Sequence, residues 1–150
     1  MLKLTGNEKT DAWKILVPTE RPENARLPVG PAIVPLALWQ ARKAELIRRE
    51  YDHGWPLGVW LSLDESAAEI EDDVEDFTVI AIAFDKYSDG LGYRSANLLR
   101  NSYGYKGELR AIGDISEKIA RLKHFGFDAF SSGTMIWQRR PTRLQLSSAL

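Results

Sequence analysis

The chain has no cysteine among its 150 residues. It can therefore form no disulfide, thiolate metal site or cysteine nucleophile, and this absence fits a reducing cytoplasm. Net charge is close to zero, at −1, so we expect no global electrostatic attraction to nucleic acid. No apolar run approaches the roughly 20 residues of a membrane-spanning helix, and the amino terminus lacks a signal-peptide pattern. These absences predict a cytoplasmic globular protein that binds neither nucleic acid nor membrane.

The motifs of several enzyme classes are also absent. The sequence contains no Gly-x-Ser-x-Gly elbow, no Rossmann glycine pattern and no Walker A loop. Its two histidines, His53 and His124, have no partner at metal-ligand spacing, so we expect no metal site. The sequence identifies no cofactor.

Strand and helix patterns alternate through the middle of the chain, whose length fits one domain. We expect strands at about 32–36, 57–63, 77–84, 109–112 and 127–130, with helical patterns at 37–51, 66–74, 93–103 and from 115 onward. Residues 79–83 are continuously apolar, which is typical of a parallel strand covered on both faces. The pattern predicts a single α/β domain of about four to five mostly parallel strands, either a partial barrel or an open three-layer sheet.

Two helical segments have a distinctive surface pattern. Within residues 37–51, one apolar face collects Ala37, Ala41, Ala44, Ile47 and Tyr51. Residues 64–76 carry eight acids and no base, which is typical of a solvated acidic helix.

The two ends of the chain differ from the middle. Residues 1–31 contain four prolines and are predicted to be irregular, although 13–17 suit a short strand or hook. The α/β domain then occupies residues 32–133. The tail, residues 134–150, carries apolar side chains that a neighbouring subunit could bury, which makes a homo-oligomer plausible.

The most informative segment lies where the strand ending at residue 84 gives way to a helix. It contains Asp85, Asp89, Gly90, Gly92 and Tyr93. In a parallel sheet the carboxyl ends of all strands share one edge, and ligands bind there. Helix N-termini at that edge attract anions, and glycines let backbone N–H groups approach a phosphate or another oxyanion.

Further along the chain the same kind of junction recurs at Gly113-Asp114 and at Ser131-Ser132. Together with the first junction, these residues predict a ligand-binding edge. The alternative is that they are ordinary capping acids and turn glycines, which are common in such loops.

Arg110 shares a strand face with Glu108, two residues before it. Two charges on a buried sheet face are costly unless they are paired. Three roles fit Arg110: it could hold a carboxylate, phosphate or sulfur oxyanion, brace Asp85 or Asp114, or lie with Glu108 on an exposed edge.

Segments 88–93, 107–114 and 126–130 read Ser-Asp-Gly-Leu-Gly-Tyr, Gly-Glu-Leu-Arg-Ala-Ile-Gly-Asp and Gly-Phe-Asp-Ala-Phe. This pattern resembles a bacterial family, domain of unknown function nine-three-four, and the resemblance extends over roughly residues 12–133. Proteins of this family are described as oxidoreductases involved in sulfite reduction, because they are encoded beside sulfite reductase. The resemblance implies the same association for this chain. Leu91 stands where the family has arginine, and Phe125 where it has cysteine. We therefore expect no essential cysteine redox step.

Three functions follow as alternatives. The first is an accessory protein of assimilatory sulfite reduction that binds a partner, such as sulfite reductase or another sulfur-assimilation enzyme, or an oxyanion at the sheet edge. The second is a small enzyme in which Asp85 or Asp114 is an acid or base and Arg110 holds an anion. The third is a non-catalytic oligomeric scaffold.

Overall fold

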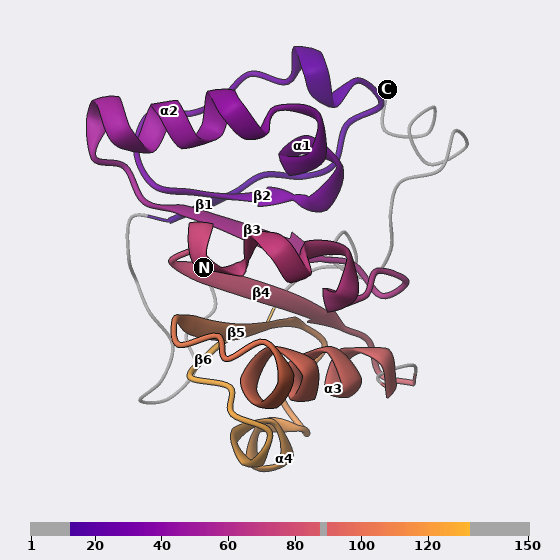
Figure 1. Ribbon diagram of the computed structural model, residues 1–150. Helices are drawn as coiled ribbons and strands as arrows, with labels where there is room; N and C mark the ends of the chain where they lie inside the picture. The colour runs from indigo at the N-terminus through magenta and orange to yellow at the C-terminus, as the bar shows by residue number, and fades with distance from the viewer. Residues whose placement is uncertain (1–12, 88–89, 133–150) are drawn as a thin grey trace.

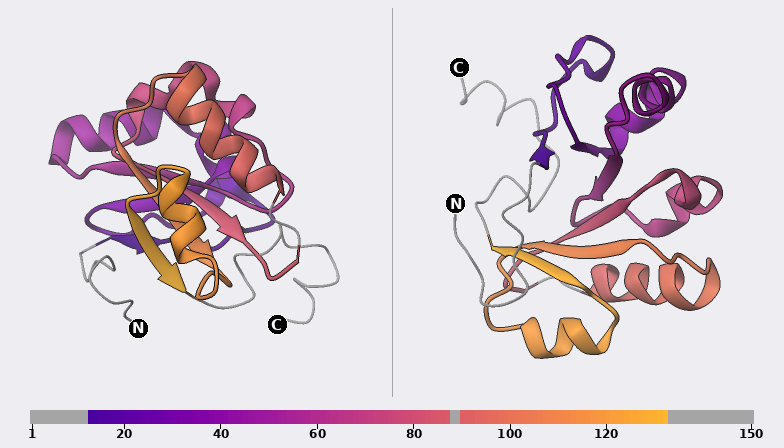
Figure 2. Two further views of the ribbon diagram at one scale, coloured as in Figure 1. Left: turned by 90° about the horizontal axis from the view of Figure 1, so that it is seen from below. Right: turned by 90° about the vertical axis from the view of Figure 1, so that its left-hand side faces the viewer.

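The computed structural model describes residues 13–87 and 90–132 (Figure 1). Six parallel strands form one sheet in chain order. They are β1 (Lys14–Ile15), β2 (Ala32–Pro35), β3 (Leu57–Leu61), β4 (Val79–Phe84), β5 (Glu108–Gly113) and β6 (Ala129–Ser132). The sheet curls into a half-barrel (Figure 2).

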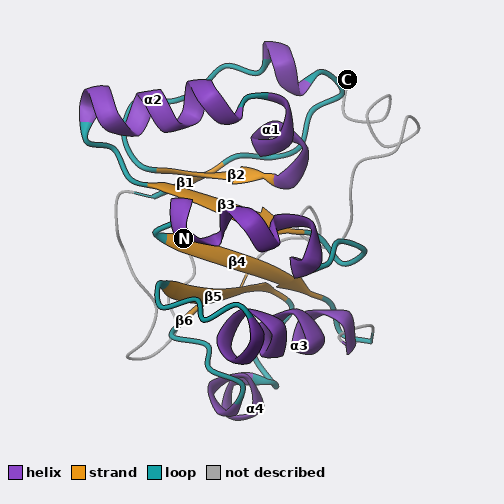
Figure 3. Ribbon diagram, viewed as in Figure 1, coloured by secondary structure: helices purple, strands orange, loops and turns teal. Residues whose placement is uncertain are grey.

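The helices of the described residues lie along one face of this sheet (Figures 2 and 3). They are η1 (Pro22–Asn24), α1 (Leu36–Ala41), α2 (Lys43–His53), η2 (Ala67–Asp76), α3 (Gly90–Asn97), η3 (Leu98–Ser102) and α4 (Ile119–His124). Among them, none has the length and apolar character needed to cross a bilayer.

The predicted α/β class and the partial-barrel alternative are confirmed. The sheet has one strand more than the upper prediction because the hook at 13–17 pairs as β1, Lys14 opposite Ala32 and Ile15 opposite Ile33. The indole N–H of Trp60 holds this segment further by donating to the carbonyl of Leu16 at 2.9 Å.

Two apolar clusters cover the two faces of the sheet. The larger one lies under the helices and includes Val59, Ile82 and Leu109. The smaller one, on the opposite face, contains Ile33, Trp60 and Ala81 among others. Every residue of β4 is buried, as its continuous apolar run predicts.

The predicted helix at 37–51 is interrupted at Arg42, whose φ of −136° is not helical. The predicted apolar stripe is also not the buried face. Leu38, Trp39 and Leu46 are the buried side chains, whereas Ile47 is 44% and Tyr51 is 88% exposed. The stripe faces solvent on both sides of the break, since Ala37 and Ala41 are exposed as well as Ala44, and Leu46 meets the sheet instead.

Arginines hold the irregular segment 13–31 against these helices. Arg42 donates to the carbonyls of Ala25 and Pro22 at 2.6 and 3.2 Å. Arg49 donates to Gly30 at 2.6 Å and to Pro28, and burial lowers its pKa. Side-chain donors thus replace the regular backbone pairing that the prolines prevent.

The acidic segment forms η2, which begins with a capping box. Ser66 accepts from the N–H of Ala68 at 3.1 Å, and Glu69 accepts from the N–H of Ser66 at 3.4 Å. Further along, burial raises the pKa of Asp76 and of Glu50, and their negative neighbours add to both shifts. The acids of η2 are therefore not all freely solvated.

Arg100, on η3, joins three segments at the amino ends of β5 and β6. Its guanidinium donates to the carbonyls of Tyr105, Gly107 and Gly126 and to the carboxylate of Asp128, at 2.7–3.3 Å. These contacts engage all five N–H groups that an arginine has. Asp128 in turn accepts from the backbone N–H of Leu109 at 3.0 Å. Arg100 therefore braces the fold and keeps no N–H group for a ligand.

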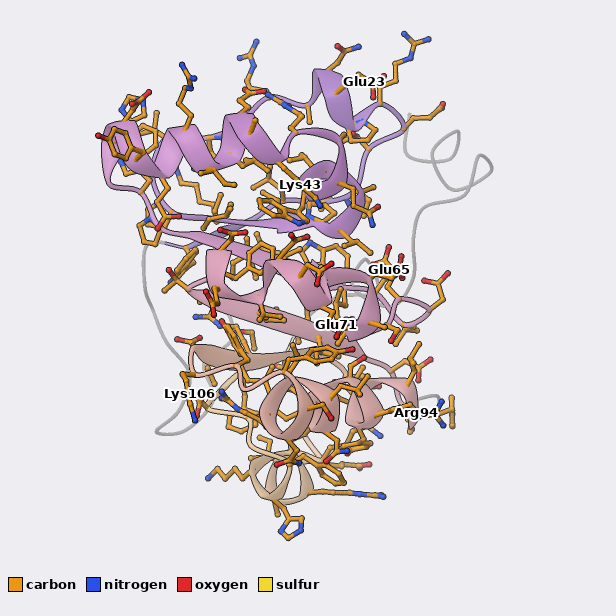
Figure 4. All side chains as sticks on the ribbon, viewed as in Figure 1. Glu23, Lys43, Glu65, Glu71, Arg94 and Lys106 are labelled. Atoms are coloured by element: carbon orange, nitrogen blue, oxygen red, sulfur yellow. The ribbon has the colours of Figure 1, made fainter. Side chains whose placement is uncertain are left out.

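Replacing Arg100 with alanine is expected to lower the free energy of unfolding by about 3 kcal/mol, because several carbonyls and one carboxylate lose their donors together. Arg100→Lys recovers less than half of this loss, since an ammonium has three donors and no planar fork. Urea unfolding measures both values. Arg94→Ala, at an exposed position of α3 (Figure 4), is the control and changes stability by less than about 0.5 kcal/mol. Equal effects at the two positions would contradict the brace.

Candidate functional site

Two aspartates lie side by side at the carboxyl edge of the sheet. In the register of β4 and β5, Phe84 is opposite Gly113, so Asp85 and Asp114 follow paired residues on neighbouring strands. The pairing continues past the strand ends, because the N–H of Asp114 donates to the carbonyl of Phe84 at 3.0 Å. We call this edge, with the loops that follow β3, β4, β5 and β6, the rim.

The two carboxylates have different surroundings. Asp85 is partly buried and accepts from the backbone N–H of Tyr87 at 2.9 Å, which fixes the start of its loop. Asp114 is exposed. Lys118 links the two loops by donating from Nζ to the carbonyl of Lys86 at 3.4 Å.

The serines of β6 complete this part of the rim. Ser131 is opposite Ile112 and shares its sheet face, while Ser132 is opposite Gly113 and faces the helices. The hydroxyl oxygen of Ser132 is buried, and no described residue forms a hydrogen bond with it. Gly133, which follows them, and Asp89 lie outside the described residues.

Tyr93 belongs to the core and not to the open rim. It is 7% exposed, and its ring contacts those of Phe84 and Phe125 at centroid distances of 5.2 and 4.7 Å. Phe125 thus contributes an aromatic contact to this part of the core.

The rim glycines have separate structural roles. Gly113 has φ +108°, and a Cβ there would lie 2.3 Å from the carbonyl oxygen of Phe84. Gly92 packs directly on the Phe84 ring, where a Cβ would lie 2.6 Å from a ring carbon. Only open space surrounds the corresponding position of Gly90, at the start of α3. Gly90 is therefore the one of these three glycines at which a side chain would meet no neighbour.

Arg110 lies in the middle of β5, opposite Ala81 and Ala129, three residues before the strand end. It is 3% exposed and donates to Glu108 from Nε at 2.9 Å and from an Nη at 2.8 Å. The exposed-edge interpretation is wrong, because Arg110 is buried and the Glu108 side chain is only 14% exposed. Glu108 lies toward the amino end of β5, so this contact draws the guanidinium away from Asp114.

The sequence analysis missed one carboxylate at the rim. Glu65 follows β3, is 6% exposed, and accepts from the N–H of Ser62 at 2.8 Å. Ser62 also donates from its hydroxyl to Asp64 at 2.7 Å. Nothing in the run of eight acids distinguishes Glu65 as the buried one, since burial follows from its place directly after a core strand.

In the described part of the rim, five carboxylates outnumber two lysines: Asp64, Glu65, Asp85, Asp114 and Glu117 against Lys86 and Lys118. Such an edge attracts cationic groups and repels free anions. Within residues 13–87 and 90–132, no three Asp, Glu or His side chains lie close enough together to hold a metal ion. The chemistry that this arrangement favours is recognition of a basic group.

Fold and rim together define a class, a parallel α/β half-barrel with acids at the carboxyl edge. Residues 58–143 match the family described as "Bacterial protein of unknown function (DUF934)". The match spans more than half of the chain and includes β3 to β6, so the protein belongs to this family, and the predicted membership is confirmed. No curated protein matches the sequence.

The two rim glycines provide a matched pair of substitutions. Gly113→Ala is expected to lower the free energy of unfolding by about 3 kcal/mol or more, because the new methyl group meets a backbone carbonyl at positive φ. Gly90→Ala is expected to leave stability unchanged or to raise it by up to about 1 kcal/mol, since alanine favours a helix start over glycine. Thermal unfolding of the two variants compares them. A tolerated Gly113→Ala would show that the strands do not approach as described.

Proposed function

We propose that this protein is a non-catalytic accessory protein of assimilatory sulfite reduction that works in the cytoplasm. It binds sulfite reductase, or another sulfur-assimilation enzyme, through the rim. The observation that carries the proposal is the adjacency of Asp85 and Asp114 on neighbouring strands. The link to sulfur metabolism comes from the family resemblance, and the site itself argues for docking.

Binding fits the rim better than catalysis does. Enzymes tune a general base by burial and by charged neighbours, and Asp114 is exposed. The anion holder of the enzyme alternative, Arg110, is engaged with Glu108 below the rim. The enzyme alternative stays a prediction with less geometric support.

A basic protein surface fits the rim better than a free oxyanion does. An oxyanion approaching the open start of α3 would also approach the carboxylate of Asp85, five residues before it, and Asp114 on the next strand. Like charges at such an edge oppose binding, whereas lysine or arginine side chains of a partner gain from both carboxylates. The ligand class we propose is therefore a basic patch on the partner enzyme.

The test removes the rim charges while preserving the fold. Asp85→Asn/Asp114→Asn keeps an oxygen at position 85 that can accept from the N–H of Tyr87. Tagged full-length protein is used to capture partners from cells that grow on sulfate, and the interaction is then titrated with the purified enzyme. We expect a sulfur-assimilation enzyme with the unchanged chain and at least tenfold weaker binding with the rim variant, more so at low salt.

The matched control, Glu71→Gln/Asp72→Asn, removes two exposed charges from η2 and is expected to bind normally. Figure 4 labels Glu71. Equal binding by all three proteins would contradict rim docking. Sulfite binding by the isolated protein, without any protein partner, would instead assign the rim to an oxyanion.

A further inference from the structure

Helix α2 turns an apolar stripe toward solvent. Ala44, Ile47, Arg48, Tyr51 and Asp52 line a shallow groove of about 580 Å³ along it, which we call the α2 outer face. The described residues expose five large hydrophobic side chains, and two of them, Ile47 and Tyr51, are on this face. This strip is small, so a docking role for it has to be argued from the residues around it.

A third exposed hydrophobic side chain extends this surface. Val29 is 69% exposed and shares a second groove, of about 320 Å³, with Arg48 and Asp52. The loop at 27–29 therefore continues the apolar area beside α2. Arg48 and Asp52 line both grooves and so lie between Val29 and the apolar side chains of the helix.

The charged side chains of the α2 outer face form no ion pair or hydrogen bond with another described residue, whereas the charged side chains beside them do. Arg42 pairs with Glu45 at 2.7 Å, and Arg49 donates to two backbone carbonyls. No ion pair or hydrogen bond joins Arg48 or Asp52 to another described residue. Both side chains are exposed.

We propose that the α2 outer face binds a second copy of this chain, with the two α2 helices antiparallel about a twofold axis between Ile47 and Arg48. This arrangement places Tyr51 of each copy over Ala44 of the other, the bulkiest side chain of the face against the smallest. The two Ile47 side chains meet beside the axis. A twofold contact of this kind uses one self-complementary patch on both copies.

The same axis pairs the opposite charges. Side chains on a helix lean toward its N-terminus. In the antiparallel pair, Arg48 therefore leans toward Asp52 of the second copy, and that Asp52 leans toward Arg48. Two symmetric Arg–Asp pairs form on the side of the axis opposite Ile47. A parallel arrangement would instead align Arg48 with Arg48 and Asp52 with Asp52, and like charges disfavour it.

The contact is small, so the association is weak. Helix α2 has 11 residues and is about 16 Å long, which is short for an interface of standard size. We expect a monomer–dimer equilibrium with a dissociation constant on the order of 100 µM.

Sedimentation velocity of the full-length protein from about 10 µM to about 1 mM measures this equilibrium. Tyr51→Ala is expected to weaken dimerisation at least tenfold, because it removes the anchor over Ala44. Tyr87→Ala is the control: Tyr87 is 84% exposed but lies on the loop after β4, so its loss leaves dimerisation unchanged. Circular dichroism verifies that both variants keep the fold.

A charge-swap experiment tests the antiparallel geometry. Arg48→Asp alone gives two Asp–Asp contacts, and Asp52→Arg alone gives two Arg–Arg contacts, so each variant is expected to be at least tenfold weaker as a dimer. Mixing the two variants restores both opposite-charge pairs, so a heterodimer of about the original affinity forms. This result distinguishes the twofold contact from nonspecific association.

Three results would overturn the proposal. The first is a protein that stays monomeric at about 1 mM. The second is dimerisation that Tyr51→Ala does not weaken. The third is a mixture of the Arg48→Asp and Asp52→Arg variants that associates no better than either variant alone. A monomer whose capture of another protein is lost with Tyr51→Ala would assign the face to that protein and not to a second copy.

Discussion

The parallel register of β4 and β5 is the constraint on which the rest of the structure depends. It runs without a break from Val79 opposite Glu108 to Phe84 opposite Gly113. This register brings Asp85 and Asp114 to one edge, and it places Arg110 and Glu108 on the face away from the helices. Gly113 makes the last pair possible, because a side chain there would meet the carbonyl of Phe84. A shift by one residue would exchange the two faces of β5 and separate the rim acids.

The two ends of the sheet have different tasks. At the amino end, Arg100 fastens the approaches to β5 and β6, and the Tyr105 hydroxyl donates to the carbonyl of Phe77 at 3.0 Å. Burial raises the pKa of Tyr105, which keeps that donor protonated. Much of the segment that resembles the family, including Gly107, Gly126 and Asp128, serves this brace. At the carboxyl end, Asp114 is exposed and Asp85 is partly buried, at the edge where ligands bind in parallel α/β folds.

The sequence allowed the parallel architecture to be predicted because β3 and β4 are apolar on both faces. Two features depended on contacts that no local pattern contains. Strand β1 has two residues and exists through pairing with β2 and the bond from Trp60 to Leu16, so it was read as a hook. The stripe from Ala37 to Tyr51 was treated as one apolar face, but its residues are exposed on both sides of Arg42, and Leu38, Trp39 and Leu46 are buried instead.

The rim could be placed from the sequence, but the roles of its residues could not. Asp85 and Asp114 lie where strand ends predict them, since a parallel sheet gathers those ends at one edge. Gly92 could equally have served a ligand or a ring, and the position of Phe84 decides for the ring. Arg110 was expected to need a partner, and its own neighbour Glu108 supplies one. Such choices depend on side-chain distances across strands.

The central claim is that Asp85 and Asp114 belong to one continuous surface at the carboxyl edge, and cross-linking tests it most directly. The chain has no cysteine, so Asp85→Cys/Asp114→Cys introduces the only two thiols. A short bifunctional thiol reagent is expected to join them quickly within one chain. Asp85→Cys/Lys106→Cys, with its second thiol at the amino end of β5 about 20 Å away, is expected not to react in this way. Failure of the first pair to cross-link, or equal rates for both pairs, would contradict the account.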